Sequence, residues 1–65
     1  MDIQERFSHK VPTNAQSVSL SVLRQHFATL ATIVEGEVPK GEYRTLAIET
    51  LEEAAMWANK GVMHG

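Results

Sequence analysis

The feature that most limits the fold of this chain is a break from Gly36 to Gly41, which separates two long segments with helical periodicity. Glycine and proline, the latter at position 39, both disfavour a continuing helix. Upstream, Pro12 disfavours helix before it, and Thr13 or Asn14 is a good N-cap for the first helical segment. The sequence therefore predicts an arm over 1–13, a helix over 14–35, a turn over 36–40 and a second helix over 41–63.

The apolar residues of the two predicted helices form matching seams. In the first helix, spacings of three and four alternate along Leu20, Leu23, Phe27, Leu30 and Val34. In the second helix, the corresponding seam consists of Ala47, Leu51, Ala54, Ala58 and Val62. Helices of similar length joined by so short a turn pack as antiparallel neighbours. The predicted fold class is all-α: a single-domain antiparallel helical hairpin with a short N-terminal arm.

Both helices carry more apolar surface than one partner helix covers. The second helix widens its seam to an arc of about 200° with Tyr43, Leu46, Ile48, Ala55 and Trp57. The first helix has a separate strip of Ala15, Val18, Val22 and Ile33. Such surfaces usually mark an interface, and a domain of 65 residues without cysteine has no disulfide to stabilise it. The sequence predicts a homo-oligomer; alternatively, Ile3 and Phe7 of the arm fold back and cover part of the excess.

The chemistry of the chain does not indicate an enzyme. Its three histidines, His9, His26 and His64, form no His-x-x-x-His or Glu-x-x-His pattern, and there is neither a cysteine nucleophile nor a glycine-rich phosphate loop. The net charge of −2 gives no general attraction to nucleic acid or anionic membranes, and no segment has the apolar length of a membrane span. We therefore expect no catalytic residue, metal or cofactor, and neither DNA nor a membrane as partner.

One basic residue stands among small side chains on the first helix. Arg24 shares a strip with Ser17, Ser21 and Ala28, which leave room for a planar or anionic ligand. A guanidinium group binds phosphate through two parallel hydrogen bonds. The alternative is an arginine at the edge of the seam whose aliphatic stem covers apolar surface while its head stays in water.

Two further groups of residues are candidates for ligand contacts. In the arm, the rings of Phe7 and His9 lie next to Lys10, and rings stack on bases while an ammonium group suits phosphate. Phe7 is alternatively a core residue.

Near the C-terminus, Met56, Asn59, Lys60 and Met63 share one side of the second helix, opposite the predicted seam, and His64 comes next. Exposed methionines suggest a second contact surface; the alternative is a frayed, partly apolar helix end. On the same helix, Glu49, Glu52 and Glu53 are expected to form a solvated acidic face, with recognition of a base amino group as the alternative.

The order of several short motifs resembles one known family. The most specific is Leu51 to Asn59, where Leu-Glu-Glu-Ala leads to Met-Trp-Ala-Asn. Supporting motifs are Phe7 to Pro12, Arg24, Pro39 to Gly41 and Thr45 to Ile48. Together they resemble the phage anti-CBASS cyclic-oligonucleotide sponges, whose helical-hairpin domain is shared with anti-Thoeris sponges. The resemblance implies a non-catalytic protein that sequesters cyclic oligonucleotide signals in the host bacterial cytoplasm during phage infection and so blocks CBASS signalling.

The resemblance also implies an assembly and two kinds of site. Family members are similar to compact oligomers, and a hexamer is expected here, with sites between protomers. By position, His9 takes the place of the base-stacking aromatic residue and Arg24 that of the phosphate-binding cation, with Phe7, Lys10 and Ala28 beside them in a cyclic dinucleotide site. A second, cyclic trinucleotide site would consist of His64, Lys60 and Met63.

Two departures from the family pattern affect these sites. The imidazole of His9 offers less stacking surface than the usual tyrosine, and His64 replaces an arginine without supplying a permanent charge.

Two other functions are compatible with a helical hairpin. One is an oligomeric interaction protein that docks on a host protein through the face bearing Met56 and Met63 and binds no nucleotide. The other is a helix-turn-helix DNA-binding protein, which is disfavoured because Glu49, Glu52 and Glu53 lie on the candidate recognition helix.

Overall fold

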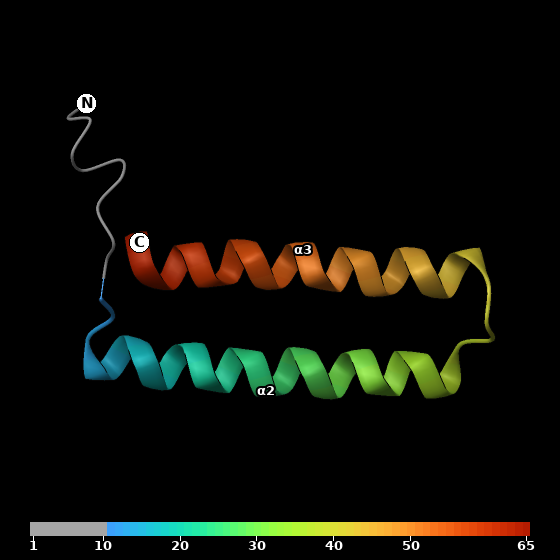
Figure 1. Cartoon of the computed structure of the whole chain (residues 1–65), viewed down its shortest axis with the longest axis horizontal. Coiled ribbons are helices and arrows are strands. Elements are labelled where there is room, and N and C mark those ends of the chain that lie inside the picture. Colours follow the sequence, from blue (N-terminus) through green and yellow to red (C-terminus); the bar gives the residue numbers. More distant parts are fainter. Residues whose placement is uncertain (1–10) are drawn as a thin grey trace, which may run out of the picture.

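The structure, a computed structural model, describes residues 11–65 and consists there of two long antiparallel helices (Figure 1). Helix α2 spans Asn14–Glu37 and helix α3 spans Glu42–His64. The two run side by side, so that the start of α2 and the end of α3 lie at the same end of the hairpin (Figure 1). The predicted all-α hairpin is confirmed.

A reciprocal pair of hydrogen bonds fixes the start of α2. The Thr13 hydroxyl oxygen accepts from the backbone N–H of Gln16 at 3.1 Å, and the Gln16 side-chain oxygen accepts from the backbone N–H of Thr13 at 2.9 Å. This capping box satisfies two backbone donors that the helix itself leaves without partners. Of the two candidate cap residues, Thr13 therefore fills the role.

The end of α2 differs from the prediction. The helix does not stop at Gly36 but continues to Glu37, and Val38 forms an extended C-cap with φ −100° and ψ 126°. The physical reason is Pro39, whose ring disfavours helical backbone at the residue before it, whereas glycine only weakens a helix. Gly41 then adopts φ 156° and ψ −170°, a region essentially restricted to glycine, and α3 starts one residue later than expected.

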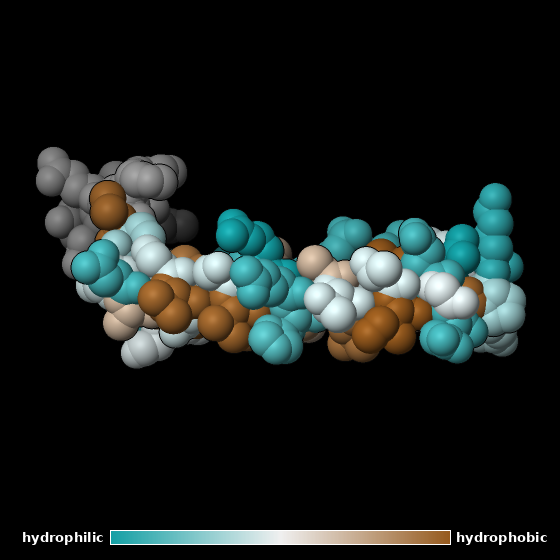
Figure 2. All heavy atoms as spheres, turned by 90° about the horizontal axis from the view of Figure 1, so that it is seen from below, coloured by the Kyte–Doolittle hydropathy of each residue, from teal (hydrophilic) through white to brown (hydrophobic). Residues whose placement is uncertain are grey.

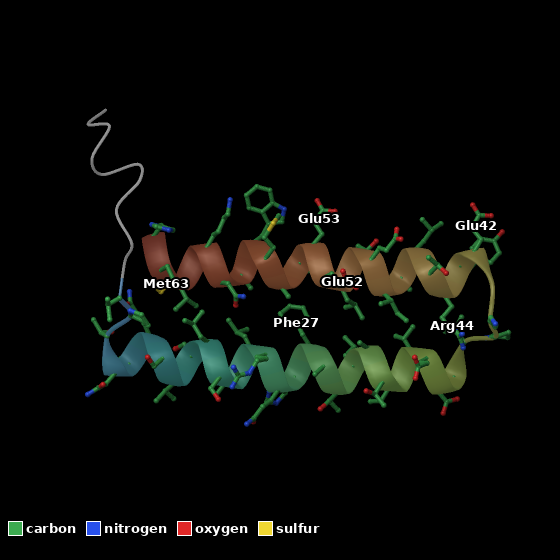
Figure 3. The ribbon with its side chains drawn as sticks, viewed as in Figure 1. Phe27, Glu42, Arg44, Glu52, Glu53 and Met63 are labelled. Carbon is green, nitrogen blue, oxygen red and sulfur yellow. The ribbon has the colours of Figure 1, made fainter. Side chains whose placement is uncertain are left out.

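Most of the predicted seam is confirmed, and the contact line on α3 is rotated only slightly from it. The half-buried seam residues are Leu20, Leu23, Phe27 and Val34 on α2 and Ala47, Leu51, Ala58 and Val62 on α3. Phe27 reaches between the helices (Figure 3), and the half-buried residues of α3 include Ile48, Leu51, Ala55 and Ala58. Ala54 and Leu30, both predicted to lie in the seams, are instead exposed. The contact line on α3 therefore passes closer to Ala55 than to Ala54.

A hydrogen bond across the hairpin lies at each end of the seam. At the open end, Nε2 of Gln16 donates to the carbonyl oxygen of Val62 at 3.2 Å. At the turn, Nη1 of Arg44 donates to the carbonyl oxygen of Glu35 at 3.2 Å. These bonds fix the longitudinal position of α3 against α2, which apolar contacts alone specify weakly because they are not directional.

None of the residues from 11 to 65 is fully buried. Large apolar side chains remain open to solvent on both helices, with exposed fractions of 63% for Val18, 52% for Ile33 and 58% for Trp57. Seen from the α2 side, apolar surface forms two groups, one towards each end of that helix (Figure 2). A single pair of helices leaves this surface uncovered. Neither helix of the described residues combines the length and hydrophobicity that a membrane span requires.

Candidate functional site

Arg24 lies at a hollow of about 350 Å³ between the two helices, which we call the Arg24 hollow. Its lining comes from both helices and comprises Leu20, Arg24, Phe27, Ala55, Asn59 and Met63. The three α3 residues are spaced at intervals of four, so they form a row on one face of the helix. Met63 and Phe27 each lie on the side of their helix that faces the other (Figure 3).

The Arg24 hollow combines an apolar floor with two polar groups. The floor is formed by aliphatic, aromatic and thioether side chains, while the guanidinium of Arg24 comes from α2 and the carboxamide of Asn59 from α3. Sites for small molecules generally have this composition, in which apolar contacts provide area and a few polar groups fix orientation. The guanidinium supplies a permanent charge and paired donors, which suit a phosphate group.

A smaller hollow of about 180 Å³ continues the Arg24 hollow towards the turn. The two share Phe27 and Ala55, and the smaller one adds Ala28 and Glu52 among its lining residues. We call the two hollows together the Arg24 groove. Because Arg24 lines one part and Glu52 the other, the groove has opposite charges along its length. Arg24 and Ala28, both predicted to contact a cyclic dinucleotide, therefore lie on the same groove.

The three C-terminal residues predicted to form a second site are not gathered in one place. Met63 lines the Arg24 hollow, whereas Nζ of Lys60 lies 5.2 Å from the centroid of the Trp57 ring in a cation–π arrangement. His64 is the exposed last residue of α3. Within one protomer, Met63 thus belongs with Arg24 rather than with Lys60.

The prediction that Asn59 and Met63 face away from the first helix is wrong. Both line a hollow formed against α2, and Met63 is half-buried. The physical reason is the rotated contact line, because Asn59 and Met63 then lie at the edge of the seam, in a row with Ala55, instead of opposite the seam. Met56 does remain exposed, at 44% of its surface.

The only tryptophan of the sequence lies outside the groove. Trp57 is 58% exposed, and its Nε1 donates to a carboxylate oxygen of Glu53 at 3.5 Å. Glu53 points away from α2 (Figure 3). The ring is therefore held on the outer surface of the hairpin by two neighbours on its own helix, Glu53 and Lys60.

A third hollow, of about 420 Å³, lies nearer the turn and has a different composition. It is lined by Leu30, Val34, Leu46, Ala47, Thr50, Leu51 and Ala54. Its one polar side chain, Thr50, donates its hydroxyl to the carbonyl oxygen of Leu46 at 2.7 Å. This hollow offers no charged group to an anionic ligand, and its composition is that of a protein contact surface.

Three of the predicted site residues, Phe7, His9 and Lys10, lie outside the described residues. Of the residues that complete the hollow around Arg24, Asn59 was not among those predicted for a nucleotide site. The spacing of Ala55, Asn59 and Met63 was visible in the sequence. The wide apolar arc of α3 leaves the position of the contact line undetermined, so the sequence predicts Ala55 beside the seam but Asn59 and Met63 opposite it. In residues 11–65, no cluster of acidic and histidine side chains has the arrangement of a metal site.

Comparison with known families gives a match that extends over nearly the whole chain. The model of the Acb2/Tad1 hairpin domain matches residues 1–63. The chain therefore belongs to the Acb2/Tad1 hairpin family, and the relationship to the anti-CBASS and anti-Thoeris sponges predicted from its motifs is confirmed. Searches of curated proteins and of solved structures gave no significant match.

Proposed function

We propose that this member of the Acb2/Tad1 hairpin family is a non-catalytic sponge that binds and sequesters cyclic oligonucleotide immune signals. Cyclic dinucleotides such as cyclic GMP-AMP are the primary ligands, and their removal blocks CBASS signalling in the cytoplasm of a phage-infected bacterium. The observation that carries the proposal is the position of Arg24 on a groove with an apolar floor. A phosphate binds the guanidinium, and a base covers the neighbouring apolar surface.

The proposed site lies between protomers of a homo-oligomer, a hexamer by resemblance to the family. Support comes from the apolar side chains that a single hairpin leaves exposed, among them Val22, Ile33, Leu46 and Trp57. A second protomer placed over the groove would exclude water from the phosphate, and the charge contact with Arg24 would then be stronger than on an open surface. In the proposed site, His9, Lys10 and Phe7 of the arm contribute stacking surface and a further cation.

The decisive experiment is isothermal titration of the protein with cyclic GMP-AMP and with cyclic triadenylate. For the dinucleotide, we expect Arg24→Ala to weaken binding about 10- to 100-fold, because a charge-assisted pair of hydrogen bonds is lost. Arg24→Lys keeps the charge without the planar fork and is expected to give an intermediate loss. Lys40→Ala, which removes a positive charge at the exposed turn, is the matched control and should leave the affinity within about twofold. If neither ligand binds at micromolar protein, the proposal is contradicted.

The absence of catalysis is tested on the same complexes. After incubation, the protein is denatured and the nucleotide is analysed by chromatography. A sponge returns the cyclic nucleotide unchanged, whereas a phosphodiesterase returns linear products. Full recovery after an incubation much longer than the binding time is the expected result.

A cyclic trinucleotide site involving His64, Lys60 and Met63 is the second part of the proposal. Met63 and His64 are the last two residues of α3. In the proposed arrangement, the C-terminal ends of α3 from several protomers meet around one ligand. His64→Ala is expected to weaken cyclic triadenylate binding and to spare cyclic GMP-AMP. Equal loss for both ligands would place His64 in a general structural role instead.

The alternative function is an oligomeric interaction protein that docks on a host protein and binds no nucleotide. Its predicted docking surface requires Met56 and Met63 to be exposed together, but Met63 is half-buried in the Arg24 hollow. A pull-down from host lysate that depends on Met56 and Met63, combined with no nucleotide binding, would favour this alternative.

A further inference from the structure

We propose that Asn59 determines the base specificity of the Arg24 hollow and selects a cyclic dinucleotide that carries adenine. This inference rests on the proposed function and adds a residue and a base preference to it. Asn59 and Arg24 are the two polar residues that line the hollow, and they come from opposite helices. A nucleotide that places its phosphate on the α2 side therefore presents its base to the α3 side.

The carboxamide of asparagine is complementary to one purine edge. Adenine presents a donor, the N6 amino group, next to an acceptor, N7, and a carboxamide pairs with both through its oxygen and its NH₂ group. Guanine presents two adjacent acceptors, O6 and N7, along the same edge. The oxygen of the carboxamide would then face another acceptor, and one of the two hydrogen bonds is lost.

The rest of the hollow suits a purine rather than a second charged group. Phe27, Ala55 and Met63 line it with apolar atoms, which cover the faces of a base. A thioether also makes favourable contacts with aromatic rings. Towards the turn, Glu52 lines the adjoining hollow, and its carboxylate repels a phosphate placed there. The charges of Arg24 and Glu52 thus favour one orientation of the ligand, with one of its two phosphates at Arg24 and neither beside Glu52.

Two ligands isolate this effect, because cyclic di-AMP and cyclic di-GMP have the same ring and charge and differ only in their purines. Titration of the unmodified protein is expected to give about tenfold tighter binding of cyclic di-AMP, the preference typical of one good two-bond contact to a base. Asn59→Leu retains most of the side-chain volume and removes both polar groups. We expect this variant to bind the two ligands with nearly equal affinity.

Two further variants complete the design. Asn59→Ala repeats the test with a residue of high helix propensity, so that loss of selectivity in both variants is not due to steric effects of leucine. Asn14→Ala, at the exposed start of α2, is the control and should retain the preference for cyclic di-AMP. Circular dichroism verifies that each variant is helical; Asn59 is exposed, so neither substitution removes buried packing.

The outcomes separate this inference from the proposed function. Binding of neither ligand by the unmodified protein overturns the role of Asn59, and it overturns the proposed function as well only if cyclic GMP-AMP and cyclic triadenylate also fail to bind. Equal binding of both ligands by the unmodified protein, or a preference that survives Asn59→Leu and Asn59→Ala, overturns only the role of Asn59. A preference that disappears in both Asn59 variants and persists in Asn14→Ala supports it.

Discussion

Nε2 of Gln16 donates a hydrogen bond of 3.2 Å to the carbonyl oxygen of Val62, across the open end of the hairpin. The oxygen of the same carboxamide accepts from the backbone N–H of Thr13 at 2.9 Å and completes the capping box of α2. The Gln16 side chain therefore connects the first turn of α2 both to Thr13, the residue before that helix, and to the last turn of α3. Truncation of this side chain should loosen the open end of the hairpin.

Gln16→Ala is expected to lower the free energy of unfolding by about 1–2 kcal/mol, since two hydrogen bonds are lost. The loss stays modest because the groups left behind, the Thr13 N–H and the Val62 carbonyl, are not deeply buried. Urea unfolding followed by circular dichroism measures the change. Gln25→Ala, at an exposed position of the same helix, is the control and should change stability by less than about 0.5 kcal/mol. Equal effects of the two substitutions would show that the cross-helix bond contributes nothing.

Two glycines in and beside the turn are expected to respond to the same substitution with opposite signs. Gly41 has φ 156°, so Gly41→Ala should destabilise the protein by about 1–3 kcal/mol. Gly36 lies in helical backbone with open space where a Cβ would be placed, so Gly36→Ala should stabilise it by about 0.5 kcal/mol. Thermal unfolding at a single protein concentration tests both, because the stability of an oligomer depends on concentration. Destabilisation by Gly36→Ala would indicate that another protomer packs against that position.

The exposed apolar surface of α2 leads to a prediction about assembly. The protein should sediment as a homo-oligomer, and Ile33→Glu, which places a charge where 52% of an isoleucine is exposed, should shift it to smaller species. Thr32→Glu introduces the same charge at the adjacent position on another side of the helix and is the control. Analytical ultracentrifugation distinguishes the outcomes. A monomeric unmodified protein, or equal dissociation by both variants, would contradict this assignment of the interface.

The contact between Lys60 and Trp57 predicts that a substitution of Lys60 changes the surroundings of Trp57 without changing the affinity for cyclic dinucleotides. Lys60→Gln should change the fluorescence of Trp57, because Nζ lies 5.2 Å from the ring centroid. The same substitution should leave cyclic dinucleotide affinity within about twofold, because Lys60 does not line the Arg24 groove. Trp57 is the only tryptophan, so the emission comes from this ring alone. A large loss of dinucleotide affinity would instead place Lys60 at the ligand, through a neighbouring protomer.

Much of the fold could be predicted because it depends on local signals. Two helical periodicities and a short break with Pro39 allow little other than an antiparallel hairpin. Helix α2 ends two residues beyond the predicted end, because Gly36 does not stop it. A glycine lowers helix stability by about 1 kcal/mol, whereas the ring of Pro39 clashes with the backbone of Val38 and disfavours helical geometry there.

The site was less predictable, because it depends on how α3 is rotated about its own axis. With an apolar arc of about 200°, several contact lines bury similar apolar area. A contact line centred on Ala54 would direct Asn59 and Met63 away from α2. A contact line that passes through Ala55 brings both residues beside Arg24. Directional hydrogen bonds from Gln16 and Arg44 to carbonyl oxygens of the opposite helix accompany the second arrangement.

The sequence by itself determined the helical hairpin, a cap at Thr13 or Asn14, the family and the choice of Arg24 as a candidate, since each depends on neighbouring residues or on motif order. Only the tertiary structure decided which residues of α3 face Arg24, because hydrophobic periodicity defines a broad face while packing selects one line within it. That selection places Asn59 and Met63 at the hollow and leaves Lys60 with Trp57 on the outer surface.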